Sequence, residues 1–300
     1  MTTLAVGERP SLRDSVAFDA VICISPAILL LVAMTLLPLA AVVVLSVTDY
    51  QLGGTDIHFI GIENFMRIGE SDDAGRAILN TLRFTALVVP ASVAIGLVLA
   101  LLVSARGRLR RAYELLLFLP LTATMTVMAI VWSLLLHGQI GPINVALKAM
   151  GLAPIEFLSN VELVLPSLAL IAVWQQSSFC FVVFLAGLSA IPTEVYEAAA
   201  LDRVGSGWER FRRITWPLLA PTTVVVLLLT TIKAFQVFDL VAVLTQGGPQ
   251  GATDVLLYET YLQAFSYFRI GYGSALIMLF IAFVGIVSTL QMWFARRRQP

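Results

Sequence analysis

The sequence predicts an all-α polytopic membrane protein with six transmembrane helices. Of its 300 residues, 59% are hydrophobic and 13% are charged, whereas soluble domains carry about 25% charged residues. Six apolar stretches each reach the roughly 20 residues that a helix needs to cross a bilayer core. The arginines gather in alternate segments between these stretches. Together these observations exclude a soluble globular domain.

The predicted spans follow one another along the chain and form one membrane domain. They cover residues 20–47, 77–103, 115–136, 163–190, 218–244 and 272–294. Neighbouring helices can satisfy backbone groups that a proline frees, so prolines within or near these spans predict kinked helices in a packed bundle. Residues 1–19 are expected to form a cytoplasmic tail, residues 20–295 the six-helix domain and residues 296–300 a basic C-terminus.

Basic residues predict which ends of the spans face the cytoplasm. Thirteen arginines lie in the N-terminal tail, after the second and fourth spans and at the C-terminus, whereas the opposite segments hold four basic residues. Segments rich in lysine and arginine stay on the cytoplasmic side. Both termini and the loop of residues 191–217 are therefore expected in the cytoplasm.

The 191–217 loop has the composition of two short helices joined by a turn. Residues 198–200 are alanines, which are the strongest helix formers, and Gly205 can help to end the helix. The second segment carries an apolar stripe at three-residue spacing, formed by Trp208, Phe211 and Ile214. These residues alone fit a helix on the membrane surface and a helix that docks a partner equally well.

The same loop resembles the EAA loop of permease subunits in binding-protein-dependent ABC importers. In that pattern, Glu-Ala-Ala is followed by Asp-Gly and then by Phe-x-x-Ile-x-Leu-Pro. The matching residues are Glu197, Ala198, Ala199, Asp202, Phe211, Ile214 and Pro217. Arg203 replaces the usual glycine, Trp216 replaces the leucine, and the segment from Asp202 to Phe211 is one residue longer than common. These departures affect the expected turn, where Gly205 takes the place of the missing glycine.

Further motifs along the chain resemble the carbohydrate branch of that family. They are Asn80-Thr81-Leu82-Arg83-Phe84, Phe118-Leu119-Pro120, Phe184-Leu185-Ala186-Gly187-Leu188, Phe238-Asp239 and Leu244-Thr245-Gln246-Gly247-Gly248-Pro249. Their order implies a type I ABC importer permease fold with a cytoplasmic coupling helix. The Gly-Gly-Pro loop resembles that of the first, maltose-F-like permease of a pair.

The resemblance also implies the partners of this subunit. They are a second homologous permease in a heterodimer, two ATP-binding cassette subunits and an extracytoplasmic solute-binding protein, in a bacterial plasma membrane and without nucleic acid. The sequence has no phosphate-binding Gly-x-x-x-x-Gly-Lys-Ser/Thr loop, so ATP and Mg are expected on the partner ATPase. No catalytic or metal-binding residue is expected here. The expected ATPase-coupling residues are Glu197, Ala198, Ala199, Ala200, Asp202, Gly205 and Phe211.

Polar residues inside the predicted spans mark a candidate substrate pathway, because polar groups at membrane depth are expensive unless they face protein or water. The candidates are Trp174, Gln175, Gln176, Lys233, Gln236 and Asp239. In the fifth span, Thr230, Lys233, Gln236 and Asp239 recur every three residues, which predicts a polar stripe on one helix. These groups could also join helices by hydrogen bonds, and the sequence leaves both interpretations open.

Two other classes of function compete with an importer subunit. An ion-gradient-driven secondary transporter is expected to place ionisable groups in several spans, but here only Lys233 and Asp239 lie well inside. A membrane-bound enzyme would need a cluster of catalytic side chains at one depth, which the sequence lacks. If the chain is an importer subunit, its sequence is compatible with a sugar and with another polar solute, such as glycerol phosphate, as the substrate.

Overall fold

The computed structural model describes residues 12–54, 56–105, 109–201 and 207–297. This part of the chain is helical and contains no β-strand. Residues Thr48 and Phe59 form an isolated antiparallel β-bridge. Five helical segments are long and apolar enough to cross a membrane, and a sixth is obtained if a bent helix pair counts as one span. The all-α membrane fold is therefore confirmed, with five or six spans.

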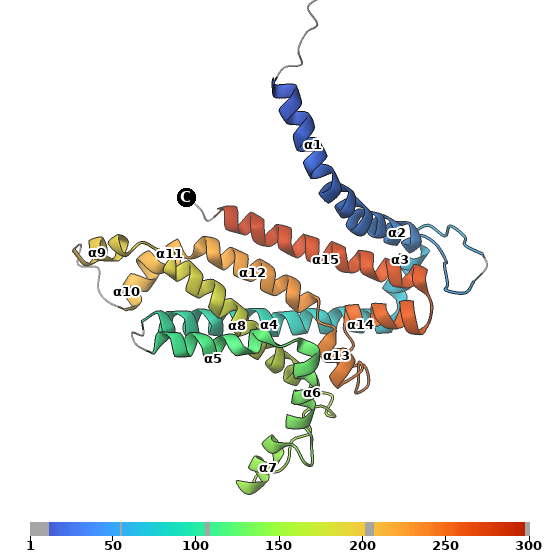
Figure 1. Ribbon diagram of the computed structural model, residues 1–300. Helices are drawn as coiled ribbons and strands as arrows, with labels where there is room; N and C mark the ends of the chain where they lie inside the picture. Colours follow the sequence, from blue (N-terminus) through green and yellow to red (C-terminus); the bar gives the residue numbers. More distant parts are fainter. Residues whose placement is uncertain (1–11, 55, 106–108, 202–206, 298–300) are drawn as a thin grey trace, which may run out of the picture.

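An N-terminal arm projects away from the bundle at its beginning and packs against the C-terminal helix at its end (Figure 1). It consists of α1 (Leu12–Leu31), the π-helical turn η1 (Val32–Leu36) and α2 (Leu37–Ser46). The arm begins before residue 20, so part of the expected tail is helical. None of its most apolar stretch is buried within the chain.

The other spans form the bundle and, except for α6, which turns away, they run roughly side by side (Figure 1). They are α4 (Asp72–Ser104), α5 (Arg110–Thr122) with α6 (Met125–Leu135), α8 (Val164–Ser189), α12 (Ala220–Phe235) with α13 (Asp239–Leu244), and α15 (Ile270–Arg297). Short helices lie between spans: α3 (Glu63–Glu70), α7 (Pro142–Ala149), and α14 (Leu256–Tyr261) with η3 (Leu262–Ser266). The 191–217 loop holds α9 (Thr193–Leu201), α10 (Trp208–Arg210), η2 (Phe211–Thr215) and α11 (Trp216–Leu218).

Helices α4 and α8 form the most closely packed pair of the bundle. Phe84 of α4 and Phe181 and Phe184 of α8 are almost fully buried. Gly96 allows the close approach, because a Cβ atom there would lie 2.8 Å from the Phe181 backbone nitrogen and still closer to the Cys180 Cβ. This packed pair provides the frame on which the polar residues of α8 are held.

The predicted third span, over residues 115–136, is broken into two helices, a sharper change than the kink expected from its proline. The chain bends by 96° between α5 and α6, because Ala123 and Thr124 are extended with ψ angles of 142° and 144°. Gln175 on α8 compensates at the break: its Nε2 donates to the Pro120 and Ala123 carbonyl oxygens at 3.3 and 3.0 Å. A side chain from another helix thus satisfies carbonyls that a continuous helix would have satisfied itself.

The predicted fifth span is also interrupted. Helix α12 ends at Phe235, Gln236 caps it with ψ 15°, and α13 begins only at Asp239. The expectation of one polar stripe on a continuous helix is therefore wrong beyond Phe235. The break instead places Gln236 and Asp239 on different segments.

The end of the bundle opposite the 191–217 loop is held together by two side chains of α4. Asn80 Nδ2 donates to the carbonyl oxygens of Gly251 and Asp254, both at 2.9 Å. Thr81 Oγ1 accepts a hydrogen bond from the Leu256 backbone N–H at 2.9 Å. These bonds tie the Gly-Gly-Pro loop and the start of α14 to α4. They give a structural reason for two motifs that lie far apart in the sequence.

Two buried carboxyl groups lie beside this clamp. Asp254 is 8% exposed and Glu259 is 4% exposed. Burial, followed by repulsion from Glu259 and a hydrogen bond with it, raises the pKa of Asp254 from 3.8 to about 8. Asp73 adds to the repulsion, whereas Arg76 opposes it. Asp254 therefore keeps its proton at neutral pH.

We expect Asp254 to make the protein less stable as the pH rises from about 4 to 8. In that interval the carboxyl group has released its proton in the unfolded protein but still holds it in the folded protein. The contribution of this group to the free energy of unfolding therefore falls by about 1.4 kcal/mol for each unit that the pH rises. The Asp254→Asn variant lacks this contribution. Between pH 5 and pH 8, the apparent melting temperature of the purified complex should therefore fall more for the wild type than for Asp254→Asn. Parallel profiles would contradict the assignment.

Candidate functional site

A cavity of about 270 Å³ opens between the broken spans. Its walls come from α4, α6, α8 and α12 and from the break that leads into α13. The lining residues are Phe84, Val88, Met125, Ala172, Gln175, Gln176, Lys233, Ala234, Gln236, Val237, Phe238, Asp239 and Leu240. The volume is close to the lower end of the roughly 300–1,000 Å³ typical of small-molecule sites.

Five of the six predicted pathway residues line this one cavity: Gln175, Gln176, Lys233, Gln236 and Asp239. Trp174 is not among the lining residues. Its ring packs edge-on against Trp132, with ring centroids 5.7 Å apart, and its side chain is 37% exposed. Trp174 therefore contributes to the aromatic packing between α6 and α8.

The polar residues of α8 differ in what they do. Gln175 lines the cavity and also joins α8 to the α5–α6 break through its amide. Gln176 is 8% exposed and faces the cavity. The hydroxyls of Ser177 and Ser178 donate to the Trp174 carbonyl at 3.0 and 3.5 Å. These serines therefore bond to their own helix.

Lys233 supplies the cavity with a positive charge. Its Nζ lies 4.4 Å from the centre of the Phe179 ring, an arrangement in which the ring face attracts the cation. Within the part of the chain that the structure describes, Lys233 forms no ion pair with Asp239. The cavity thus offers three amides, a cation and a carboxylate beside apolar walls. Such a lining can hydrogen-bond the hydroxyls of a small polar solute.

The 191–217 loop presents most of its predicted coupling helix outwards. On α9, Glu197, Ala198 and Ala200 are exposed, whereas Ala199 is only 8% exposed and packs against its own chain. Leu201 and Trp208, two large apolar side chains of the loop, are 85% and 72% exposed. Asp202 and Gly205, also predicted to take part in coupling, lie outside the described residues.

Aromatic contacts hold the second segment of the loop. The Phe211 ring stacks on Trp208 at 5.3 Å between centroids and lies 6.0 Å from Trp216. Phe211 therefore packs within the loop. Gly207, which precedes α10, has a φ of 82°, a left-handed conformation that favours glycine. The glycine turn that the structure describes is at Gly207.

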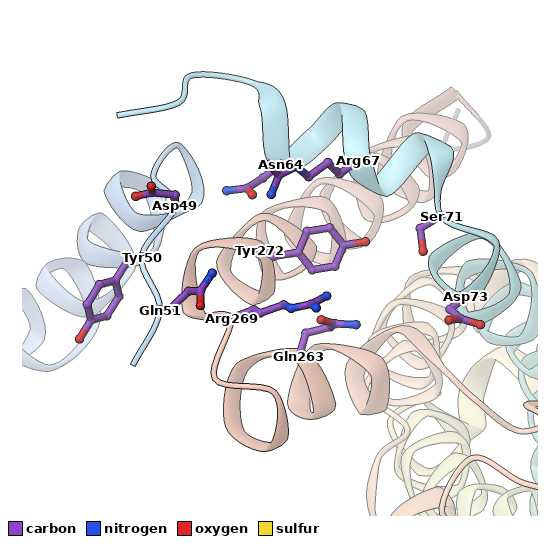
Figure 2. A pocket seen from close by; sticks show the side chains of 10 residues that line it. All are labelled: Asp49, Tyr50, Gln51, Asn64, Arg67, Ser71, Asp73, Gln263, Arg269 and Tyr272. Atoms are coloured by element: carbon purple, nitrogen blue, oxygen red, sulfur yellow. The ribbon is translucent and has the colours of Figure 1, made fainter. Parts of the chain in front are cut away.

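A second polar cavity, of about 470 Å³, lies at the opposite end of the bundle and was not predicted. Figure 2 shows Tyr272, Arg269 and Gln263 pointing into the space between residues 49–51 and Asp73. Asn64 shapes its wall, because its Nδ2 donates to the Ser46 and Thr48 carbonyl oxygens at 3.0 and 2.8 Å. These residues are scattered through three segments, so no local pattern could have brought them together.

Comparison with known proteins decides the family. A family model described as "binding-protein-dependent transport system inner membrane component" matches residues 92–300, more than half of the chain. The chain belongs to this family. The permease is therefore a membrane subunit of an ABC importer, and a non-enzymatic role agrees with a family of transport proteins.

Curated relatives extend over most of the permease. It is 32% identical over 264 residues to the sulfoquinovosyl glycerol transport system permease protein SmoG of Agrobacterium fabrum, covering 88% of this chain and 85% of that protein. It is 33% identical to the trehalose/maltose transport system permease protein MalF of Thermococcus litoralis, over 77% of each chain. It is 31% identical to the sn-glycerol-3-phosphate transport system permease protein UgpA of Agrobacterium fabrum, and the match covers 92% of this chain and 94% of that protein.

Solved structures share the fold of the permease. A bacterial ABC transporter involved in import of the acidic polysaccharide alginate matches with a TM-score of 0.82, covering 96% of this chain and 97% of that chain at 22% identity. A second structure of a bacterial alginate transporter, in complex with an alginate pentasaccharide-bound periplasmic protein, matches equally well.

Proposed function

We propose that this permease imports a sugar or sugar-like solute through the cavity between its broken spans. The observation that carries the proposal is the convergence of Gln175, Gln176, Lys233, Gln236 and Asp239 on that cavity. Amide and charged groups beside apolar walls suit a polyhydroxylated ligand. The named solutes of the relatives, a sulfoquinovosyl glycerol and trehalose or maltose, support the same class.

A phosphate-bearing solute such as glycerol phosphate is the second candidate. Lys233 favours it, because a charge-assisted hydrogen bond from an ammonium group suits a phosphate oxygen. The resemblance to a glycerol-3-phosphate permease supports this candidate. An ion-gradient mechanism has no comparable observation in its favour.

In the membrane, α5 and α6 would act as one interrupted span, which gives six spans with both termini in the cytoplasm of a bacterial cell. The basic ends of α5, α10 and α15 lie at the same end of the bundle (Figure 1). Clustered arginines favour the cytoplasmic side. The 191–217 loop lies at this end too.

We assign the 191–217 loop as the contact with an ATPase subunit that binds ATP and Mg. The exposed face of α9 with Glu197, Ala198 and Ala200, followed by Asp202 and Gly205, forms the docking surface, while Ala199 and Phe211 hold the loop to its own chain. A second permease would complete the pathway, with two ATP-binding cassette subunits below. A solute-binding protein would dock at the opposite end, where the cavity around Arg269 offers polar partners.

Solute uptake by variants of the cavity tests this function. We expect Gln236→Ala to lower the maximal uptake rate about twofold to twelvefold, the effect of losing one hydrogen bond of about 0.5–1.5 kcal/mol. The measurement is uptake of labelled solute by vesicles that contain the complete complex, with saturating binding protein. Gln139→Ala, on an exposed residue that does not line the cavity, is the matched control. Unchanged uptake by Gln236→Ala would exclude this cavity as the pathway.

The Lys233→Met variant separates the two solute classes in the same assay. For a phosphate-bearing solute, loss of a charge-assisted bond of about 1.5–3 kcal/mol predicts a reduction in uptake of more than tenfold. For a neutral sugar the reduction should be no larger than that of Gln236→Ala.

A further inference from the structure

A long groove lies between the 191–217 loop and the end of α4, and no function described above uses it. Its volume is about 1,050 Å³. The apolar part is formed by α4, the floor by the end of α8, and the other wall by α9, α10 and η2. The residues used below are Ala94, Leu97, Val98, Leu101, Arg110, Ser189, Tyr196, Trp208 and Arg210, all of which line it.

The wall on α4 has the form of a track for an acyl chain. Ala94, Leu97, Val98 and Leu101 recur at intervals of three or four residues, so they share one face of the helix. At 1.5 Å per residue, the distance from Ala94 to Ser104 is about 15 Å. This length equals about half of the 30 Å hydrocarbon core of a bilayer. The apolar wall on α4 is therefore about as long as the hydrocarbon part of one lipid leaflet is thick.

The groove becomes polar and basic where the track ends. Arg110 donates through Nε to Glu114 at 2.6 Å and through Nη2 to the Ser189 hydroxyl at 3.3 Å. The Arg210 guanidinium lies 5.7 Å from the centre of the Tyr196 ring. Within the described ranges, Arg210 has no carboxylate partner. One of the two arginines is therefore available for an anionic group.

We propose that this groove binds one anionic phospholipid, with an acyl chain along α4 and the phosphate at Arg210, Ser189 and Arg110. The charge of the groove complements an anionic headgroup, and basic pockets between helices on the cytoplasmic side bind such headgroups. The lipid would fill the space between the 191–217 loop and α4. It would thereby brace the loop in the position from which it contacts an ATPase, a role that adds to the proposed import function.

Fluorescence of Trp208 tests the proposal, because this side chain lines the groove and is 72% exposed. The complete complex is placed in phosphatidylcholine nanodiscs that contain increasing fractions of brominated phosphatidylglycerol or brominated phosphatidylcholine. The Trp208 signal is the difference between the wild type and Trp208→Phe. We expect brominated phosphatidylglycerol to quench it at a lower mole fraction than brominated phosphatidylcholine.

Variants of the headgroup site sharpen the test. One arginine near an anionic surface contributes about 1 kcal/mol, so Arg210→Gln should raise the half-quenching mole fraction about fivefold. Arg110→Gln should act in the same direction. Arg212→Gln is the matched control: it removes the same charge from the same loop but does not line the groove.

Three results would overturn the proposal. Equal quenching by both lipids would mean ordinary contact with the bilayer. Absence of quenching by either lipid would mean that another helix, such as one of the second permease, covers the groove. Relief of quenching by millimolar soluble glycerol phosphate would identify a site for a free anion instead of a lipid.

Discussion

The Ala198→Trp variant is expected to reduce solute-stimulated ATP hydrolysis by a factor of about 5 to 150 while the protein still inserts into the membrane. Ala198 is exposed on α9, on the face that we assign to the ATPase contact. A large side chain in a close-packed contact costs about 1–3 kcal/mol, which corresponds to that factor. The measurement is ATP hydrolysis by the reconstituted complex with the loaded binding protein. Glu197→Lys, on the same face, should act in the same direction.

A matched control separates loss of docking from a general effect of tryptophan. Ala149→Trp places the same residue on α7, another short helix, at an exposed position away from the 191–217 loop. It should leave stimulated hydrolysis unchanged. Full stimulation in an assembled Ala198→Trp complex would contradict the assignment of α9 as the coupling helix.

The Gly96→Leu variant is expected to destabilise the permease strongly. Gly96 lies at a close contact between α4 and α8, where even a Cβ atom would overlap with Cys180 and the Phe181 backbone. The overlap involves backbone atoms, so the two helices must separate. We expect the free energy of unfolding to fall by about 1–3 kcal/mol, the usual cost of overpacking. The measurements are the yield of monodisperse protein in mild detergent and its apparent melting temperature.

Gly285→Leu provides the comparison for Gly96→Leu. Gly285 also lies within a membrane helix, α15, but a Cβ atom there would have nothing within 4 Å. This variant should keep the yield and melting temperature of the wild type. Equal behaviour of the two variants would show that the α4–α8 contact does not limit stability.

Hydropathy was sufficient to predict the membrane fold but not the breaks within it. The third and fifth predicted spans are continuous in apolar composition, yet the chain bends after Thr122 and unwinds after Phe235. Pro120 indicated a kink in the third span. The position of the break depends on Gln175, a residue of another helix that satisfies the freed carbonyls. Such a contact cannot be read from the local sequence.

The candidate site was predicted in composition more accurately than in geometry. Polar residues in apolar spans identified five lining residues of the cavity, although the expected stripe on one helix is wrong. On α9, the alanines have equal propensity, so their sequence could not show that Ala199 faces inwards while its neighbours face outwards. The contact of the Asp254 segment with α4 and the groove at Arg210 likewise required segments distant in sequence to come together.

The most direct measurement is ATP hydrolysis by the complete complex in proteoliposomes, with candidate solutes delivered by the binding protein. We expect a sugar or glycerol phosphate to stimulate hydrolysis, and the same solute to accumulate inside the vesicles only when ATP is supplied to the ATPase subunits. Accumulation of solute by this chain alone, driven by an ion gradient and without ATP, would contradict the proposed import mechanism.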